Sequence, residues 1–161
     1  MITPRIRSRL VVSLALCAMM GASFAAPLAH AQSPIHVSVR TPSNDFRDHL
    51  LALVNRSRNS RGLPRLRLNL PLSREARKHS RDMARAGAIS HTSNLADLIR
   101  GVGGTVFGED VGMGRAITGI RDAWLRRPDT RRILLDARFH RVGLGVIHIG
   151  GFYWVTLQAF D

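Results

Sequence analysis

The C-terminal stretch of the chain carries the pattern that most constrains its fold. Apolar residues occupy alternate positions of residues 142–146, with Gly143 and Gly145 between them, and a second alternating run begins at Phe152 after Gly150-Gly151. Alternation is typical of a β-strand, because successive side chains lie on opposite faces. A two-residue Gly-Gly loop is typical of a tight hairpin turn. The sequence therefore predicts two antiparallel strands whose apolar face other elements must cover.

The segments before this hairpin have helical periodicity, which Phe46, Leu50 and Leu53 illustrate. Four helices are predicted from apolar spacing, caps and stops: from Asn44 or Asp45 to before Gly62, from Ser73 to Gly87, from Ser93 or Asn94 through Ile99, and from Thr118 to Pro128. Residues 64–71 are expected to form an irregular connection, and residues 105–107 a third strand. The expected fold class is α+β, with helices packed on a small antiparallel sheet.

The first residues form a pattern of their own. Three arginines precede an apolar, uncharged run over residues 10–24, and Ala29 and Ala31 are small residues at the positions that a signal peptidase reads. A membrane anchor is the alternative, but the run is shorter than the ~20 apolar residues that span a bilayer. We therefore expect a secretory signal over residues 1–31, a flexible lead-in over 32–43 and one domain over 44–161, with no membrane anchor after cleavage.

Cysteine and charge define the chemical class of the expected mature domain. Cys17, the only cysteine, lies within the signal, so packing alone must hold the domain together. The chain has 24 Lys and Arg against 11 Asp and Glu; the signal carries three arginines and no acid, which leaves +10. Such a charge favours acidic polymers and anionic lipid surfaces, although biased codon usage is an alternative source of the arginines. Nucleic acid is not expected as a partner, because few aromatic residues interleave with the arginines and export removes most nucleic acid from reach.

Four short blocks follow one another in a characteristic order in the second half of the chain. They are Ser-His-Thr-Ser at residues 90–93, Gly-Glu-Asp-Val-Gly at 108–112, a block beginning Trp-Leu-Arg-Arg-Pro-Asp-Thr at 124–134, and Arg-Val-Gly-Leu-Gly-Val at 141–146 before Tyr-Trp-Val at 153–155. In this order the chain resembles the CAP superfamily of cysteine-rich secretory, antigen 5 and pathogenesis-related 1 proteins. It is most similar to the bacterial, cysteine-poor branch. The resemblance implies a CAP-type α-β-α sandwich.

The resemblance also implies a cleft built around two histidines and two acids. His91 matches a cleft histidine that contributes to a divalent metal site, and Glu109 matches an acid that faces it. There the carboxylate would accept a hydrogen bond from the ring or share a metal with it. The alternative for both residues is a purely structural role, as a loop histidine bonded to the backbone and a carboxylate that orients it.

The other cleft positions depart from the family's pattern. Thr130 stands where the family has its second histidine, and Arg127 where it has serine or an acid. Zinc takes three or four protein ligands, so His91 and Glu109 are an incomplete set; we expect no cofactor, with zinc as the alternative at a degraded site. Our hypothesis is that Arg127 pairs with Glu109 and replaces the metal. Two acids are also notable: Asp110 replaces an asparagine of the family, and Asp129 is expected to cap a helix.

Catalysis is not expected from the remaining polar residues. His79, His140 and His148 have no recognisable metal-ligand spacing. Ser90 and Ser93 are neighbours of His91 in sequence, but serine catalysis also needs an oriented base and oxyanion donors, for which no motif is present.

The functional expectation is therefore an exported, monomeric, non-enzymatic domain, extracellular or in the cell envelope. It would bind an envelope or extracellular ligand, lipid or anionic polymer, through its cleft or its basic surface. Two alternatives belong to other classes. One is a metal-dependent hydrolase acting on envelope polymer or peptide, and the other is an interaction module that binds another exported protein.

Overall fold

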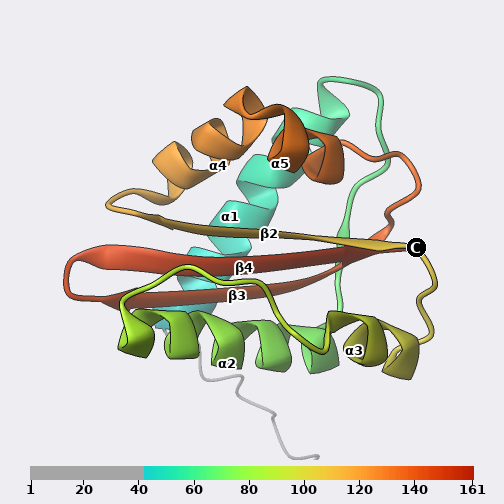
Figure 1. The fold of residues 1–161 in the computed structure, drawn as a ribbon. Helices are drawn as coiled ribbons and strands as arrows, with labels where there is room; N and C mark the ends of the chain where they lie inside the picture. Colours follow the sequence, from blue (N-terminus) through green and yellow to red (C-terminus); the bar gives the residue numbers. More distant parts are fainter. Residues whose placement is uncertain (1–41) are drawn as a thin grey trace, which may run out of the picture. The chain divides into compact units, whose positions relative to one another are not determined.

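The computed structural model describes residues 42–161 (Figure 1). The expected signal over 1–31 and the first ten residues of the expected lead-in lie outside the described residues. The elements run α1 (Pro42–Asn59), β1 (Arg67–Leu68), α2 (Leu70–Ala86), α3 (Leu95–Gly101), β2 (Phe107–Gly114), α4 (Ile117–Arg126), α5 (Pro128–Leu134), β3 (Arg141–Ile149) and β4 (Phe152–Phe160). Within residues 42–161, no helix combines the length and the apolar character needed to cross a bilayer.

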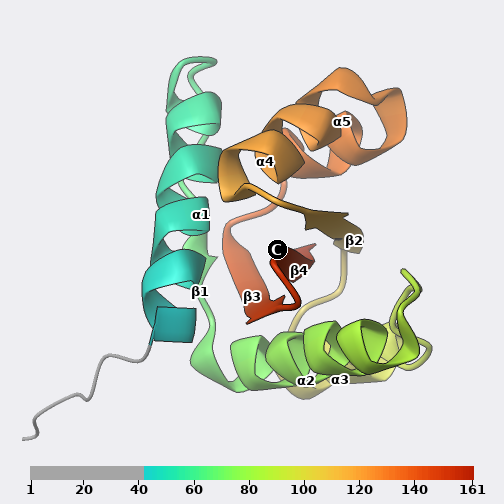
Figure 2. The ribbon, with the colours of Figure 1, turned by 90° about the vertical axis from the view of Figure 1, so that its left-hand side faces the viewer.

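The four strands form one sheet between two layers of helices. Their order is β1-β3-β4-β2, in which β4 pairs antiparallel with β3 and β2, whereas β1 runs parallel to β3. In Figure 2 the sheet is seen with α4 and α5 on one side and α2 and α3 on the other, while α1 stands beside β1 and α4. The predicted α-β-α sandwich is confirmed. The sheet is mixed rather than purely antiparallel, because β1 adds a short parallel edge.

β3 and β4 form the predicted hairpin. Ile149 and Phe152 are the last paired residues on the two sides of the turn. Gly150 and Gly151 have φ values of 62° and 76°, a left-handed conformation that costs glycine little and other residues much more. The turn residues therefore close the hairpin in a register that keeps the alternating side chains on their faces.

Separate apolar clusters bury the two faces of the sheet. The larger cluster joins α1, α4 and α5 to β3 and β4, and includes Leu50, Trp124, Leu134, Val142 and Leu157. The smaller cluster joins α2 and α3 to the end of β4, and consists of Leu72, Leu95, Ile99 and Phe160. β3 contributes to the larger cluster alone, whereas β4 contributes to both, through alternate residues such as Ala159 and Phe160.

α2 lies directly on the backbone of β3. A Cβ atom added to Gly143 would collide with the Leu72 side chain, and one added to Gly145 would collide with the backbone of Ala76. Ser80, one turn further along α2, donates its hydroxyl to Thr156 Oγ1 at 2.9 Å. The two glycines of β3, which have no side chain, therefore allow this helix to lie close to the sheet.

Two element starts differ from the sequence prediction. α2 begins at Leu70 rather than after Ser73, because the Asn69 side chain accepts from the Leu72 N–H at 2.9 Å and caps the helix there. The Ser73 hydroxyl instead donates to the Asn69 carbonyl at 2.7 Å. α1 begins at Pro42, so the last two residues of the expected lead-in are helical.

Two strands also differ from their predicted extent. β1 lies inside residues 64–71, which were expected to be irregular, and its two residues are too few to show alternation. β2 runs from Phe107 to Gly114 rather than over 105–107. β2 contains two adjacent acids and three glycines, residue types that are rare in strands, so the sequence alone did not predict its full length.

Arg58 of α1 is a fully buried charge. Its guanidinium donates to the backbone carbonyls of Pro64, Leu134, Asp136 and Phe139 at 2.8–3.1 Å. Burial lowers the pKa of this guanidinium, partly offset by the Asp136 carboxylate. The four bonds use four of the five guanidinium N–H groups and give each of the four carbonyls a donor. They join the α1–β1 connection to the α5–β3 connection.

Candidate functional site

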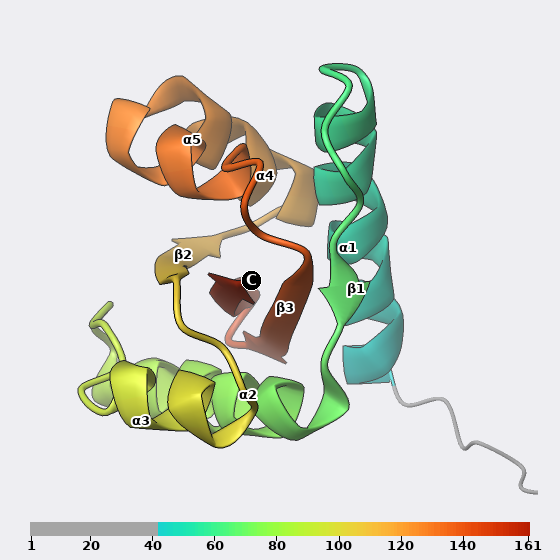
Figure 3. The same cartoon turned by 90° about the vertical axis from the view of Figure 1, so that its right-hand side faces the viewer.

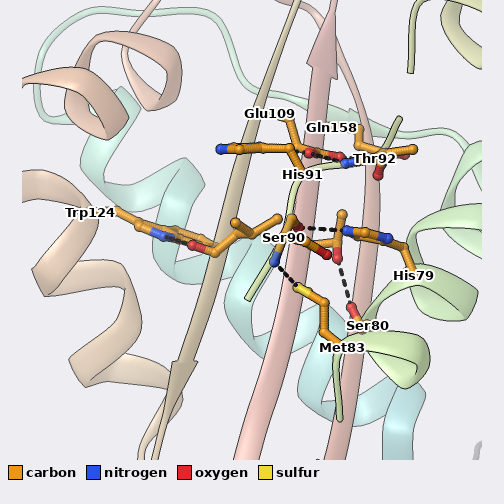
Figure 4. Close-up of polar contacts among 11 residues, drawn as sticks. His79, Ser80, Met83, Ser90, His91, Thr92, Glu109, Trp124 and Gln158 are labelled. Carbon is orange, nitrogen blue, oxygen red and sulfur yellow. Dashed lines mark hydrogen bonds and ion pairs between the residues drawn. The ribbon is translucent and has the colours of Figure 1, made fainter. Parts of the chain in front are cut away.

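The loop after α2 carries His91 to the edge of the sheet. α2 ends at Gly87, whose φ of 64° turns the chain away from the helix. The carbonyl of Ser90 accepts from His79 Nε2 at 2.8 Å, and its N–H points to Met83 Sδ at 3.4 Å. Figure 4 shows both contacts. They hold the loop against α2, so that the next residue, His91, reaches β2.

Glu109 of β2 places its carboxylate among donors from three residues (Figure 4). Oε1 accepts from the Thr92 N–H at 2.9 Å and lies 2.8 Å from His91 Nδ1, while Oε2 accepts from Gln158 Nε2 at 3.0 Å. Gln158 is there because it is the β4 residue paired with Glu109. The side chain of Glu109 is 3% exposed and that of His91 71%. The imidazole therefore covers a carboxylate that is otherwise inside the protein.

These donors keep the Glu109 carboxylate charged. Burial alone would raise its pKa, but hydrogen bonds from Thr92, Gln158 and His91 outweigh burial and lower the pKa below its ordinary value. A carboxylate only accepts, so the hydrogen in its contact with His91 belongs to Nδ1. Nε2 of the exposed ring is left for other partners.

A cleft of about 320 Å³ opens beside this loop, between β2 and α4. Its lining is mostly apolar, from Ile89, Val111, Met113, Ile120, Ala123 and Trp124, with His91, Arg127 and Thr130 as the polar residues. The Trp124 ring is held in place by a bond from Nε1 to the Val111 carbonyl at 3.0 Å. The structure thus brings together three of the four predicted cleft residues, with Glu109 behind His91.

Arg127 does not form the pair that the sequence predicted, and the Thr130 hydroxyl links two helices. Within residues 42–161 Arg127 forms no ion pair with Glu109, whose oxygens are bonded as described above, so the hypothesis of an organising pair is wrong. The Thr130 hydroxyl donates to the Trp124 carbonyl at 2.7 Å and ties α5 to α4. Arg127, not Asp129, occupies the N-cap position of α5; Asp129 lies in its first turn. The expected Asp129 cap is therefore also wrong.

The donors of the cleft do not fit a zinc ion. Zinc takes three or four protein ligands, and both oxygens of Glu109 are already bonded to protein donors. The Thr130 hydroxyl is engaged between α4 and α5. Over the part of the chain that the structure describes, no three His, Cys, Asp or Glu side chains gather as a metal site. Arg127, which also lines the cleft, adds a positive charge that repels a divalent cation.

Asp110, the next residue of β2, faces the other layer of the sandwich. On the same face, a Cβ at Gly108 would meet Ile133 of α5, and one at Gly112 would meet Trp124 of α4. The Asp110 carboxylate is fully buried and neither oxygen has a hydrogen-bond partner. Burial, together with the charge of Glu109, raises its pKa to about 8. Asp110 is therefore protonated at neutral pH and lies away from the cleft.

Sequence reasoning missed Thr92 and Gln158. Thr92 belongs to a recognised block, but its part in the site is a backbone N–H, which any residue type supplies. Gln158 donates to both Glu109 Oε2 and Thr92 Oγ1, each at 3.0 Å. The signal that could have found it is a buried amide on an otherwise apolar strand, because such a group needs a polar partner.

The other histidines do not join the cleft. His79 contacts the Ser90 carbonyl, His140 lies just before β3, and the His148 ring stacks on Tyr153 with centroids 4.4 Å apart. Within residues 42–161, no serine hydroxyl is hydrogen-bonded to a histidine ring. The described residues therefore do not assemble the hydroxyl–imidazole pair that serine catalysis uses.

Comparison with known proteins agrees with the fold. The model of the cysteine-rich secretory protein family, CAP, matches residues 51–158. An extracellular protein with an SCP domain from Bacillus anthracis is 26% identical, with a TM-score of 0.65 over 76% of this chain and 44% of that one. No curated protein matches the chain.

Two further solved structures share the fold. An outer surface protein of Borrelia burgdorferi is 14% identical, with a TM-score of 0.66 over 73% of this chain and 92% of that one. A cysteine-rich secretory protein of Staphylococcus aureus is 16% identical, with a TM-score of 0.61 over 74% of this chain and 39% of that one. This chain thus spans less than half of the Bacillus and Staphylococcus proteins. The family match covers most of the chain and the fold agrees with it, so the chain belongs to the cysteine-rich secretory protein (CAP) family.

Proposed function

We propose that this protein is exported and acts as a non-catalytic binding domain, whose cleft takes an anionic amphiphile such as a fatty acid. The observation that carries the proposal is the pairing of exposed apolar side chains with one cation in the same cleft. Ile89 is 49% exposed and Met113 43%, and Arg127 lines the same space. The apolar chain of the ligand would cover Ile89 and Met113, and its anionic head would contact Arg127.

The walls of the cleft support an apolar chain. Six of its lining residues are apolar, and the Trp124 ring is held in one orientation by its bond to the Val111 carbonyl. Ligand sites are typically lined in this way, with a few polar groups that fix orientation, and range from about 300 to 1,000 Å³. At about 320 Å³ the cleft suits one chain segment rather than a bulky ring system.

The polar residues support binding rather than catalysis. The Glu109 oxygens are engaged by Thr92, His91 and Gln158, so this carboxylate has little capacity left to act as a base. His91 Nε2 keeps a lone pair, but among residues 42–161 no serine hydroxyl is hydrogen-bonded to it and no group of three metal-ligating side chains includes it. Of the remaining groups, Arg127 suits recognition of an anion, and His91 Nε2, which accepts when Nδ1 carries the hydrogen, suits a headgroup that donates a hydrogen bond.

Quenching of tryptophan fluorescence by a brominated fatty acid tests the cleft. In Trp154→Phe the remaining emission comes from Trp124, which lines the cleft, and we expect saturable quenching as the ligand fills it. Ile89→Asp should weaken binding about tenfold or more, because it places a charge against the apolar chain. Ile149→Asp is the matched control: Ile149 is also 49% exposed but lies outside the cleft lining. Equal loss in both variants, or no quenching at all, would refute the proposal.

Arg127 tests the head of the ligand. Arg127→Gln should weaken binding of the fatty acid and remove most of its salt dependence, because a guanidinium–carboxylate contact is screened by salt. Binding of the matching fatty alcohol should be unchanged. If acid and alcohol lose affinity equally, Arg127 only packs against the ligand.

Zinc titration separates this proposal from a metal-dependent hydrolase. We expect no saturable binding in isothermal titration of the purified protein. Micromolar binding that is lost in His91→Ala would restore the hydrolase alternative. Export is tested separately by the N-terminus of the secreted protein, which should be Gln32 if a signal peptidase cleaves after Ala31.

A further inference from the structure

Figure 3 shows β1 beside β3, at the edge of the sheet opposite β2. A second cavity of the molecule lies there. Its volume is about 770 Å³, and it is lined by Pro64, Arg65, Leu66, Arg67, His140 and Arg141. We call this surface the arginine groove. It shares no lining residue with the cleft, so it is a separate place on the molecule.

The charges of the arginine groove are uncompensated. Its three arginines and His140 are exposed, and no acidic residue lines the space. Some arginines elsewhere on the surface do pair with an acid: Arg47 with Asp48, Arg85 with Asp82, Arg100 with Asp97 and Arg138 with Asp136. Within residues 42–161 none of the groove arginines forms an ion pair. Arg141 instead makes a cation–π contact, with its guanidinium carbon 6.0 Å from the centroid of the Phe160 ring.

The backbone places like charges side by side. Arg67 and Arg141 are paired residues of the parallel strands β1 and β3, so their Cα atoms are about 5 Å apart. Like charges at directly paired positions destabilise a sheet, and no acid in the groove relieves them. An anion that binds both guanidinium groups would remove this repulsion.

The walls of the groove are fixed from inside the protein. The Arg58 guanidinium donates to the carbonyls of Pro64 and Phe139, the residues just before Arg65 and His140. The Arg67 N–H donates to the His140 carbonyl at 2.8 Å and joins the two walls directly. The cationic side chains therefore project from a backbone that is already ordered, which reduces the entropy lost on binding.

We propose that the arginine groove binds a linear, phosphate-bearing polyanion. Guanidinium groups bind phosphate through two parallel N–H···O bonds, which makes arginine suited to this group. Three arginines along an open groove can contact successive phosphates of one chain, whereas a single small anion would leave some of them unpaired. The site goes beyond the proposed cleft function, because it takes a polymer and no apolar group.

Binding of long-chain inorganic polyphosphate to the purified protein tests the proposal. We expect saturable binding that weakens steeply between low and high salt, because exposed charges are screened. The variant Arg65→Gln/Arg67→Gln/Arg141→Gln should lose about tenfold in affinity for each arginine replaced, since hydrogen bonds to charged groups are strong. Replacing the same three residues by lysine keeps the charge but not the fork, and should bind with intermediate affinity.

The matched control is Arg126→Gln/Arg131→Gln/Arg132→Gln. These exposed arginines line another cavity, whose lining also includes the acid Asp136. Replacing them lowers the net charge by three, as replacing the groove arginines does. The control should bind polyphosphate almost as well as the wild type. Equal weakening in both triple variants would show that only net charge matters, and would overturn the proposal, as would unsaturable binding. Tighter binding of duplex DNA with the same number of phosphates would assign the groove to nucleic acid instead.

The cleft variant keeps the two sites distinguishable. Ile89→Asp should bind polyphosphate as the wild type does, and the groove variant should bind the brominated fatty acid unchanged. Loss of polyphosphate binding in Ile89→Asp would contradict a separate groove whatever the cleft binds.

Discussion

Glu109 and Asp110 are adjacent buried acids on one strand, yet they have opposite surroundings. Glu109 faces α2 and is bonded to Thr92, His91 and Gln158, which lowers its pKa. Asp110 faces α4 and α5, has no hydrogen-bond partner, and has a pKa raised to about 8. Both residues are buried, with Glu109 6% exposed and Asp110 0%. What differs is the set of donors that each layer of the sandwich offers.

The comparison shows that burial alone does not decide the charge of an acid. Desolvation raises the pKa of both carboxylates, and only donors positioned by neighbouring elements reverse it. In the α2 layer the donors come from a loop and from β4. In the other layer, glycines and apolar side chains surround the carboxyl group. Four substitutions test this difference, from the largest expected effect to the smallest.

Arg58 extends the comparison to a buried cation with every partner in place. Arg58→Met should lower the free energy of unfolding by about 3–5 kcal/mol, because buried carbonyls lose their donor and two connections are no longer joined. Arg56→Met is the control, since Arg56 is exposed on the same helix; its change should stay within ~0.5 kcal/mol. Urea unfolding measures both. A small effect at Arg58 would show that water replaces the guanidinium.

Gln158→Leu should make the Glu109 site resemble the Asp110 site. It removes the donor to Glu109 Oε2 and should cost about 2 kcal/mol at neutral pH. A lowered folded pKa contributes stability above the unfolded pKa, which is lost as pH falls through the folded one. Losing a donor raises the folded pKa of Glu109, so acid unfolding should begin at higher pH than in the wild type. An unchanged acid midpoint would contradict the role given to Gln158.

Asp110→Asn should remove the penalty on the unpartnered acid. With a folded pKa of about 8 against an ordinary 3.8, the folded state holds the proton longer than the unfolded state. Wild-type stability at this group therefore falls as pH rises from about 4 to 8. The variant should lack that slope and gain about 1–2 kcal/mol at pH 8. Thermal unfolding of both proteins from pH 5 to 8 measures the difference; parallel curves would mean that Asp110 has an ordinary pKa.

His91→Ala should have the smallest effect on stability. The ring is 71% exposed and only one of the donors to Glu109 is lost, so the change should be within about 0.5 kcal/mol. Differential scanning calorimetry at pH 7 measures it. A loss as large as that of Gln158→Leu would mean that the imidazole, rather than the buried amide, holds the carboxylate.

The sequence was sufficient for the hairpin and for the family. Gly150-Gly151, with alternation on both sides, required a tight turn, and the turn is found with both φ values positive. The blocks around His91 and Glu109 placed both residues at one site, where Nδ1 and Oε1 lie 2.8 Å apart. Local patterns were enough because each depends on a few consecutive residues.

The rest depends on partners that are distant in sequence. Gln158 meets Glu109 through the register between β2 and β4, which no local pattern carries. The Arg127–Glu109 pair was inferred from the position of Arg127 in the family's pattern and from its charge. In the structure, the Glu109 oxygens accept hydrogen bonds from other residues instead. The sequence prediction placed the start of α2 too late, because asparagine and serine are both common N-cap residues. In the structure Asn69, not Ser73, caps the helix.

The glycines of β3 matter to anyone who would redesign the cleft. Gly145 meets the backbone of Ala76, so Gly145→Ala would push α2 outward, and the loop that ends in His91 is anchored on α2 through His79 and Met83. A single methyl group on β3 would thus shift α2 together with the loop that carries His91, which lines the cleft. Engineering the width of this cleft therefore begins at a position that no ligand touches.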